Sequence, residues 1–223
     1  MPEPPDLFTI IDYYISELFA PTDDALEFAL NLARKAGLPE IQVSASQGKF
    51  IYLLAKIVGA RRILEIGTLG GYSTIWLARA LPEDGRMVTL EIETPHAEAA
   101  TLNLARAGLS GKVEIIIGPA LQTLPKVCDE AVEPFDFVFL DADKVNYSHY
   151  FNHIMRAVRS GSLVLADNVI RNGTVLAPQH SDPSAGAARS FNAMVAADDR
   201  LEAVVLQQVG VKGHDGLAIA RVK

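Results

Sequence analysis

Short apolar runs alternate with helix-like segments through the middle of the chain. The strand-like runs are RRILEIG, GRMVTLEI, KVEIIIG, FDFVFLDA and SLVLADNV. Between them, segments such as YSTIWLARAL, HAEAATLNLARAGL and YSHYFNHIMRAVRSG place their apolar residues on one helix face. Strands that alternate with helices at this spacing predict right-handed crossovers and a mostly parallel sheet.

The two ends of the chain have different patterns. LFTIIDYYISELF, DDALEFALNLARKAG and SQGKFIYLLAKIVGA predict three helices before the first strand, with Thr22 or Asp23 as an N-cap and Gly37 as a C-cap. At the other end, LEAVVLQQV and GLAIARV flank GVKGHDG and predict an antiparallel hairpin. The expected fold class is therefore α/β: a Rossmann-like, doubly wound, mostly parallel sheet with a C-terminal antiparallel hairpin and an N-terminal helical extension.

Composition narrows the class of protein. With 223 residues and no repeat or linker, we expect a single domain over 1–223, with the helical extension covering about residues 1–60. A net charge of -7 argues against nucleic acid as the main partner. The single cysteine, Cys128, cannot form an internal disulfide. No apolar run is long enough to cross a bilayer, and the N-terminus lacks a signal-peptide pattern, so we expect a cytoplasmic protein without a membrane partner.

The loop after the first strand, LEIGTLGGYST, predicts a nucleotide-like ligand. Its glycines allow a tight turn, but their spacing departs from the dinucleotide pattern G-x-G-x-x-G. Glu65 in the strand would repel a pyrophosphate and attract an ammonium group. Glu91, at the end of the next strand, can accept both hydroxyls of a ribose. A nucleoside with an amino-acid tail fits both carboxylates, and this combination indicates S-adenosylmethionine.

Two further strands end in oxygen ligands. Asp141 follows FDFVFL, and Asp167 and Asn168 follow LVLA. Two carboxylates and a carboxamide suit a hard cation, with Mg²⁺ the first expectation and Mn²⁺ or Ca²⁺ the alternatives. Asp-Asn pairs also form ordinary turns, so the prediction depends on the two strand ends meeting in one crevice.

The motifs LEIGTLGGYS, FVFLDADKVNY and LVLADNV together resemble the class I metal-dependent O-methyltransferases, the family of catechol and caffeoyl-CoA O-methyltransferases, and its bacterial members above all. The resemblance implies methyl transfer from S-adenosylmethionine to a hydroxyl of a catechol-type acceptor that is chelated by the metal at Asp141, Asp167 and Asn168. It implies that Lys144 is the general base and that Asp141 is a second catalytic residue. The implied cofactor-binding residues are Val43, Glu65, Gly67, Tyr72, Ser73, Glu91, Ala120 and Asp141.

One position departs from the family pattern. Pro119 stands where relatives usually carry a polar residue beside the adenine, and it offers neither a side-chain polar group nor an N–H. The Ala120 amide is therefore the expected adenine contact. Asp143 is expected to orient Lys144 or to face solvent, and Asn146 and Tyr147 to support the site.

The residues after Asn168, IRNGTVLAPQHSDPSAGAARSFN, predict loops that line the acceptor pocket, with Arg171 as a contact for an acidic group. A small phenolic acceptor with a catechol is expected, and a coenzyme A thioester is the alternative. The resemblance also implies a homodimer to which LFTIIDYYISELF contributes. Two other functions stay open: a metal-independent S-adenosylmethionine methyltransferase acting on another small molecule, and a noncatalytic protein that binds S-adenosylmethionine.

Overall fold

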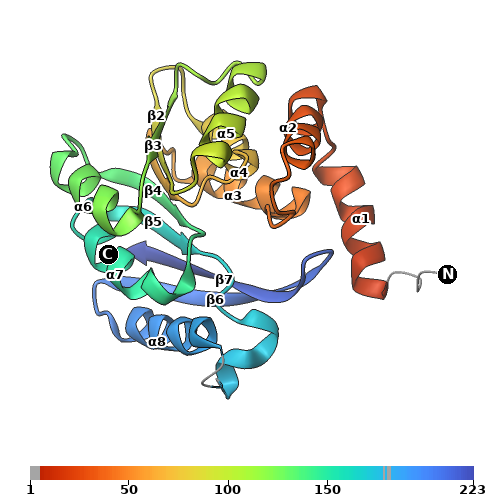
Figure 1. Ribbon diagram of the computed structural model, residues 1–223. Helices are drawn as coiled ribbons and strands as arrows, with labels where there is room; N and C mark the ends of the chain where they lie inside the picture. The colour runs from red at the N-terminus through yellow and green to blue at the C-terminus, as the bar shows by residue number, and fades with distance from the viewer. Residues whose placement is uncertain (1–5, 178, 180–181) are drawn as a thin grey trace.

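The computed structural model describes residues 6–177, 179 and 182–223. The proline-rich start of the predicted extension, 1–5, and residues 178, 180 and 181 of the predicted acceptor loop lie outside that description. Seven strands form one sheet in the order β3-β2-β1-β4-β5-β7-β6 (Figure 1). Those strands are β1 (Arg62–Ile66), β2 (Arg86–Glu91), β3 (Val113–Ile117), β4 (Phe135–Leu140), β5 (Val158–Ala166), β6 (Leu201–Gly210) and β7 (Gly213–Val222).

Strands β1 to β5 are parallel, and β7 pairs antiparallel with both β5 and β6. The chain order reverses between β1 and β4, which is the switch point where open α/β sheets bind ligands. The predicted fold class, including the C-terminal hairpin, is confirmed.

Helices cover both faces of the sheet (Figure 1). The helices are α1 (Leu7–Phe19), α2 (Asp24–Lys35), α3 (Ala45–Ile57), α4 (Tyr72–Ala80), α5 (Thr94–Arg106), α6 (Ala120–Glu130), α7 (Tyr147–Ile154) and α8 (Pro183–Ala197). Successive residues of β4 belong to opposite cores: Phe137 and Phe139 pack with α2 to α5, and Val138 and Leu140 pack with α6 to α8. Burial on both faces explains why this strand is a continuous apolar run.

Three element boundaries differ from the sequence prediction. Residues 183–192, expected as loop, belong to helix α8, and Asp182 caps that helix by accepting from the Ala185 amide. The helix that the sequence predicted to run to Gly161 is shorter: α7 ends at Ile154, and β5 already begins at Val158. The left-handed Gly161 lies within that strand. The hairpin turn is two residues long, since the strands continue to the paired Gly210 and Gly213.

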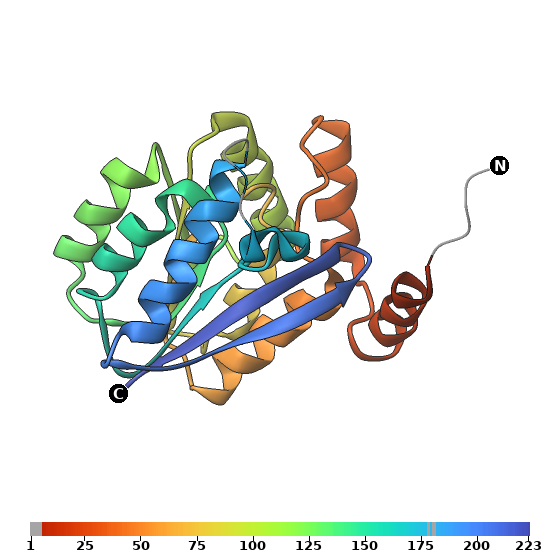
Figure 2. The same ribbon diagram turned by 90° about the horizontal axis from the view of Figure 1, so that it is seen from below.

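The first helix lies at one end of the molecule, beside the tip of the β6–β7 hairpin (Figures 1 and 2). It presents exposed large apolar side chains on most of its surface, namely Leu7, Phe8, Ile10, Ile11, Tyr13, Tyr14, Ile15, Leu18 and Phe19. Asp12 joins it to the tip of the β6–β7 hairpin by accepting from the Val211 amide at 3.0 Å.

Helix α2 is capped by Asp23 and is followed by the left-handed Gly37, as predicted. None of the helices within the described residues is both long and apolar enough to cross a membrane.

Candidate active site

A cavity of about 650 Å³ lies at the carboxyl ends of the strands. Both sets of predicted residues contribute to its wall: Val43, Gly67, Tyr72, Ser73, Glu91 and Ala120 from the cofactor set, and Asp141, Lys144 and Asn168 from the acceptor set. Glu65 and Asp167 do not line it. The cavity therefore brings together most of the residues that were singled out from separate strand ends.

The loop after β1 is shaped by backbone contacts that require glycine. Gly67 has φ +102, and a Cβ there would lie 2.1 Å from the Asp141 carbonyl oxygen. No side chain can occupy that space, so the backbones at the ends of β1 and β4 are in direct contact. This close approach brings the cofactor loop beside Asp141.

Glu91 holds the same loop from the end of β2. Its Oε2 accepts from the amides of Thr68 at 3.2 Å and Leu69 at 2.7 Å. Its Oε1 accepts from the amides of Ile92 and Glu93, each at 3.0 Å. Leu69 has a φ of +48, a left-handed conformation that is costly for a branched side chain unless its surroundings fix it. The sequence predicted Glu91 as a ribose ligand and did not predict this support of the loop.

Glu65 is fully buried below the loop and acts through its neighbours. Its carboxylate accepts from the hydroxyls of Ser73 at 2.7 Å, Thr74 at 2.5 Å and Thr89 at 2.7 Å. Burial raises the pKa of Glu65 to about 7, against the opposing effect of these three donors. Glu65 does not line the cavity, but it orients Ser73, which does.

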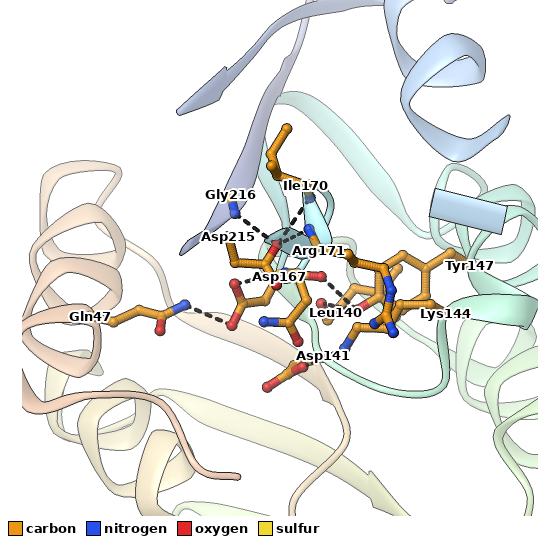
Figure 3. Close-up of polar contacts among 11 residues, drawn as sticks. Gln47, Leu140, Asp141, Lys144, Tyr147, Asp167, Ile170, Arg171, Asp215 and Gly216 are labelled. Carbon is orange, nitrogen blue, oxygen red and sulfur yellow. Dashed lines mark hydrogen bonds and ion pairs between the residues drawn. The ribbon is translucent and has the colours of Figure 1, made fainter. Parts of the chain in front are cut away.

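The acceptor side centres on the ends of β4 and β5. Lys144 Nζ lies 2.9 Å from Asp141 Oδ1, and the Lys144 side chain is only 11% exposed. Asp167 accepts from the Gln47 side chain at Oδ2, 2.7 Å, and from the Asn168 amide at Oδ1, 2.8 Å. Figure 3 shows Gln47 reaching Asp167 from the N-terminal helices.

The neighbouring acidic and aromatic residues have structural contacts. Tyr147 is buried, and its hydroxyl lies 3.1 Å from the Leu140 carbonyl oxygen and 3.0 Å from that of Asp167, so it links the ends of β4 and β5. Asp143 accepts from the Tyr150 hydroxyl at 2.6 Å and from the Asn146 side chain. Its contacts are therefore with Tyr150 and Asn146, whereas the sequence left a choice between Lys144 and solvent.

The acceptor side carries an excess of negative charge that a cation would balance. Burial and the nearby charge of Asp141 raise the pKa of Asp167 to about 7. Within the described part of the chain, no three His, Cys, Asp or Glu side chains form a metal-binding group. The candidate set is two carboxylates and one carboxamide, which are hard oxygen donors of the kind that Mg²⁺ prefers.

Two residues of this region were missed from the sequence. Gln47 contacts Asp167 across 120 positions of the chain, and Asp215 of β7 holds the loop after Asn168 through backbone amides. Gln47 lies in the segment SQGKFIYLLAKIVGA, which the sequence predicted as a helix. Asp215 lies in what the sequence predicted to be a turn. Neither carries a local signal, because both contacts depend on how the sheet is ordered.

Comparison with known proteins agrees with this arrangement. The chain matches the O-methyltransferase family over residues 21–223. It is 50% identical over 217 residues to a catechol O-methyltransferase of Niastella koreensis, covering 97% of this chain and 98% of the relative. It is 48% identical over 222 residues to a catechol O-methyltransferase of Mycobacterium tuberculosis, covering 100% and 97%. The crystal structure of a Bacillus cereus O-methyltransferase in complex with SAH superposes with a TM-score of 0.94 at 47% identity, covering 97% of this chain and 98% of that one.

The sheet order, the glycine loop and the acidic residue at the end of β2 define a Rossmann-like methyltransferase fold. The chain belongs to the O-methyltransferase family. It is an enzyme that transfers a methyl group from S-adenosylmethionine to oxygen.

Proposed function

We propose that the enzyme methylates one hydroxyl of a small catechol, and that a divalent cation held by Asp141, Asp167 and Asn168 chelates the two adjacent oxygens. The observation that carries the proposal is that Asp141, Lys144 and Asn168 line the same cavity as the cofactor residues Tyr72 and Glu91. Two relatives of near 50% identity are named catechol O-methyltransferases, which supports the acceptor class.

The cofactor half of the cavity would be formed by the loop after β1 and the start of α6. In this proposal Val43, Gly67, Tyr72 and Ser73 surround the methionine part, with Glu65 acting from below through the Ser73 hydroxyl. Glu91 contacts the ribose, and the Ala120 amide, at the first turn of α6, contacts the adenine. Pro119 also lines the cavity and offers the adenine an apolar surface.

The acceptor half would supply metal ligands and a base. A bound divalent cation would act as a Lewis acid that lowers the pKa of the coordinated hydroxyl. Lys144, in its uncharged form, would receive the hydroxyl proton, and its contact with Asp141 Oδ1 at 2.9 Å would keep Nζ beside the acceptor. The phenolate oxygen then forms a bond to the sulfonium methyl carbon as the carbon–sulfur bond breaks, and S-adenosylhomocysteine leaves. Much of the protein's contribution would be the orientation of the two reactants.

We also propose that the enzyme forms a homodimer through α1 and β6. Large apolar side chains are exposed on most of α1, and β6, the edge strand of the sheet, exposes Val204, Val205, Leu206 and Val209. Apolar patches of this kind commonly mark protein interfaces. Sedimentation equilibrium of the wild type and of an Ile10→Asp, Tyr14→Asp variant tests this: the wild type should be a dimer and the variant a monomer.

The acceptor class is tested by mass spectrometry of products from matched phenols. With S-adenosylmethionine and Mg²⁺, 3,4-dihydroxybenzoate should gain one methyl group, while 3-hydroxybenzoate, which lacks the second oxygen for chelation, should react at least about a hundredfold more slowly. Equal rates on both phenols would contradict chelation and favour a metal-independent methyltransferase.

A further inference from the structure

One carboxylate oxygen of β7 holds the loop that follows Asn168. Asp215 Oδ1 accepts from the amides of Ile170 at 3.0 Å, Arg171 at 2.8 Å and Gly216 at 2.8 Å. Figure 3 shows Asp215 next to Asp167, with its contacts converging from the backbone of Ile170, Arg171 and Gly216. The carboxylate thus joins the hairpin to the segment next to a proposed metal ligand.

The loop has a conformation that needs such support. Asn168, Arg171 and Asn172 have φ values of +56, +52 and +53, in the left-handed region that non-glycine residues rarely adopt. Ile170 is in the right-handed helical region, so Ile170 and Arg171 point successive N–H groups at one point. Consecutive right- and left-handed residues form an anion-binding nest. Here the anion is the side chain of Asp215.

The cofactor side uses the same device. Glu91 Oε2 accepts from two successive amides, the second of which belongs to the left-handed Leu69. Asp215 repeats this relation, with Arg171 in the place of Leu69. In each half of the cavity, a carboxylate on a neighbouring strand therefore fixes a strained loop that carries residues of the site.

Further contacts leave the loop little freedom relative to β7. The Val169 amide donates to the Gly216 carbonyl at 3.1 Å. A Cβ at Gly216 would lie 2.3 Å from Ile170 Cγ1, so the two segments touch directly. The His214 amide donates to the Asn172 side chain at 3.2 Å.

We propose that Asp215 is a positioning residue for the acceptor half of the site. By binding the amides of Ile170 and Arg171, it fixes the left-handed turn that keeps the Asn168 side chain in the cavity. The expected effect on metal binding rests on the proposed function, in which Asn168 is a metal ligand. Because the nest presents N–H dipoles to the carboxylate, the negative charge of Asp215 strengthens the contact. An asparagine can accept the same bonds without the charge, so Asp215→Asn should retain part of the function that Asp215→Ala loses.

The first test is amide hydrogen exchange, which needs neither metal nor substrate. In the full-length protein, Asp215→Ala should speed exchange of the Ile170 and Arg171 amides at least about tenfold, the factor expected for one lost hydrogen bond. Asp198→Ala is the matched control, since Asp198 accepts from the Arg200 amide at the far end of the same hairpin and is remote from the loop. Unchanged exchange of the two amides in Asp215→Ala would overturn the proposal.

The second test measures Mn²⁺ binding by electron paramagnetic resonance, together with the affinity for S-adenosylmethionine. Asp215→Ala should weaken Mn²⁺ binding about 10- to 100-fold, as the loss of a group that orients a metal ligand does. Asp215→Asn should lose less. Affinity for S-adenosylmethionine should stay within about twofold of the wild type, because its loop is held by Glu91. An equal loss of both affinities, or the same loss in Asp198→Ala, would show general destabilisation and overturn the proposal.

Failure of the proposed metal mechanism can be distinguished from failure of the proposal for Asp215. If the wild type binds no Mn²⁺ and turns over in chelator, the metal mechanism is wrong, and kcat/KM for the acceptor then decides the role of Asp215. A loss confined to the acceptor, with KM for S-adenosylmethionine unchanged and faster loop exchange, would still support positioning. An equal loss for both substrates would overturn it.

Discussion

Lys144 Nζ lies 2.9 Å from Asp141 Oδ1, and both residues line the same cavity as the loop after β1. Asp141 follows β4 directly, and its carbonyl oxygen is the atom that excludes a side chain at Gly67. One strand end therefore joins the cofactor loop to the proposed base and metal ligand. This contact is where transfer of the methyl group would take place.

Lys144→Ala is expected to lower kcat about 10²- to 10⁴-fold, the range for loss of a general base, with KM for S-adenosylmethionine little changed. Lys144→Arg is the informative companion, because arginine keeps the charge beside Asp141 but cannot serve as a base. Steady-state rates on a catechol measure both. Wild-type activity in Lys144→Arg would mean that the ion pair matters and the base does not.

Gln47→Leu is expected to raise the Mg²⁺ concentration needed for half-maximal activity by about tenfold, since Asp167 Oδ2 loses its donor at 2.7 Å and the carboxylate is no longer oriented. Saturating Mg²⁺ should restore most of the rate. The exposed Gln122→Leu on α6 is the control and should behave like the wild type. A Gln47→Leu enzyme with the wild-type Mg²⁺ response would exclude this support of Asp167.

Glu91→Ala is expected to weaken S-adenosylmethionine binding by more than about tenfold, because four backbone amides lose their acceptor and the left-handed Leu69 loses its restraint. Isothermal titration calorimetry measures the affinity. The exposed Glu98→Ala on α5 serves as the control. Unaltered cofactor affinity in Glu91→Ala would contradict both the loop support and the ribose contact.

Glu65 should make stability depend on pH. Its pKa is about 7 when folded and near 4.5 when unfolded, so between these values the folded protein binds more protons. Stability from this group is therefore fully present below about pH 4.5 and is lost as pH rises to 7, by on the order of 3 kcal/mol. Urea unfolding without cofactor at pH 5 and pH 7.5 measures this. The fall should be smaller in Glu65→Gln, and an identical fall in both proteins would refute the assignment.

The sequence predicted the parts of this molecule that depend on local pattern. The succession of strands and helices along the chain followed from the alternation of apolar runs, and the positions of Gly67, Glu91 and Asp141 followed from where those runs end. Helix α8 was missed because the proline, serine and glycine near its start resemble loop, although Asp182 caps it and Phe191 and Val195 anchor it in the core.

The contacts that support the site were not predictable in the same way. Gln47 meets Asp167, and Asp215 meets Ile170 and Arg171, only because the sheet order puts β5 beside β7 and brings α3 to the strand ends. Burial of Glu65 below its loop likewise depends on Thr89 of the neighbouring strand. The pattern of apolar and polar residues predicts which side chains face a core, but it does not predict which distant groups the polar side chains will contact.

Dependence on a divalent cation distinguishes catechol chelation from the metal-independent alternative. The rate of catechol methylation should be measured after treatment with EDTA and again after Mg²⁺ is restored, for the wild type and for Asp167→Ala. EDTA should lower the wild-type rate at least about a hundredfold, and Mg²⁺ should restore it, whereas Asp167→Ala should stay inactive in both conditions while still binding S-adenosylmethionine. Full wild-type turnover in EDTA would show that the reaction needs no divalent cation.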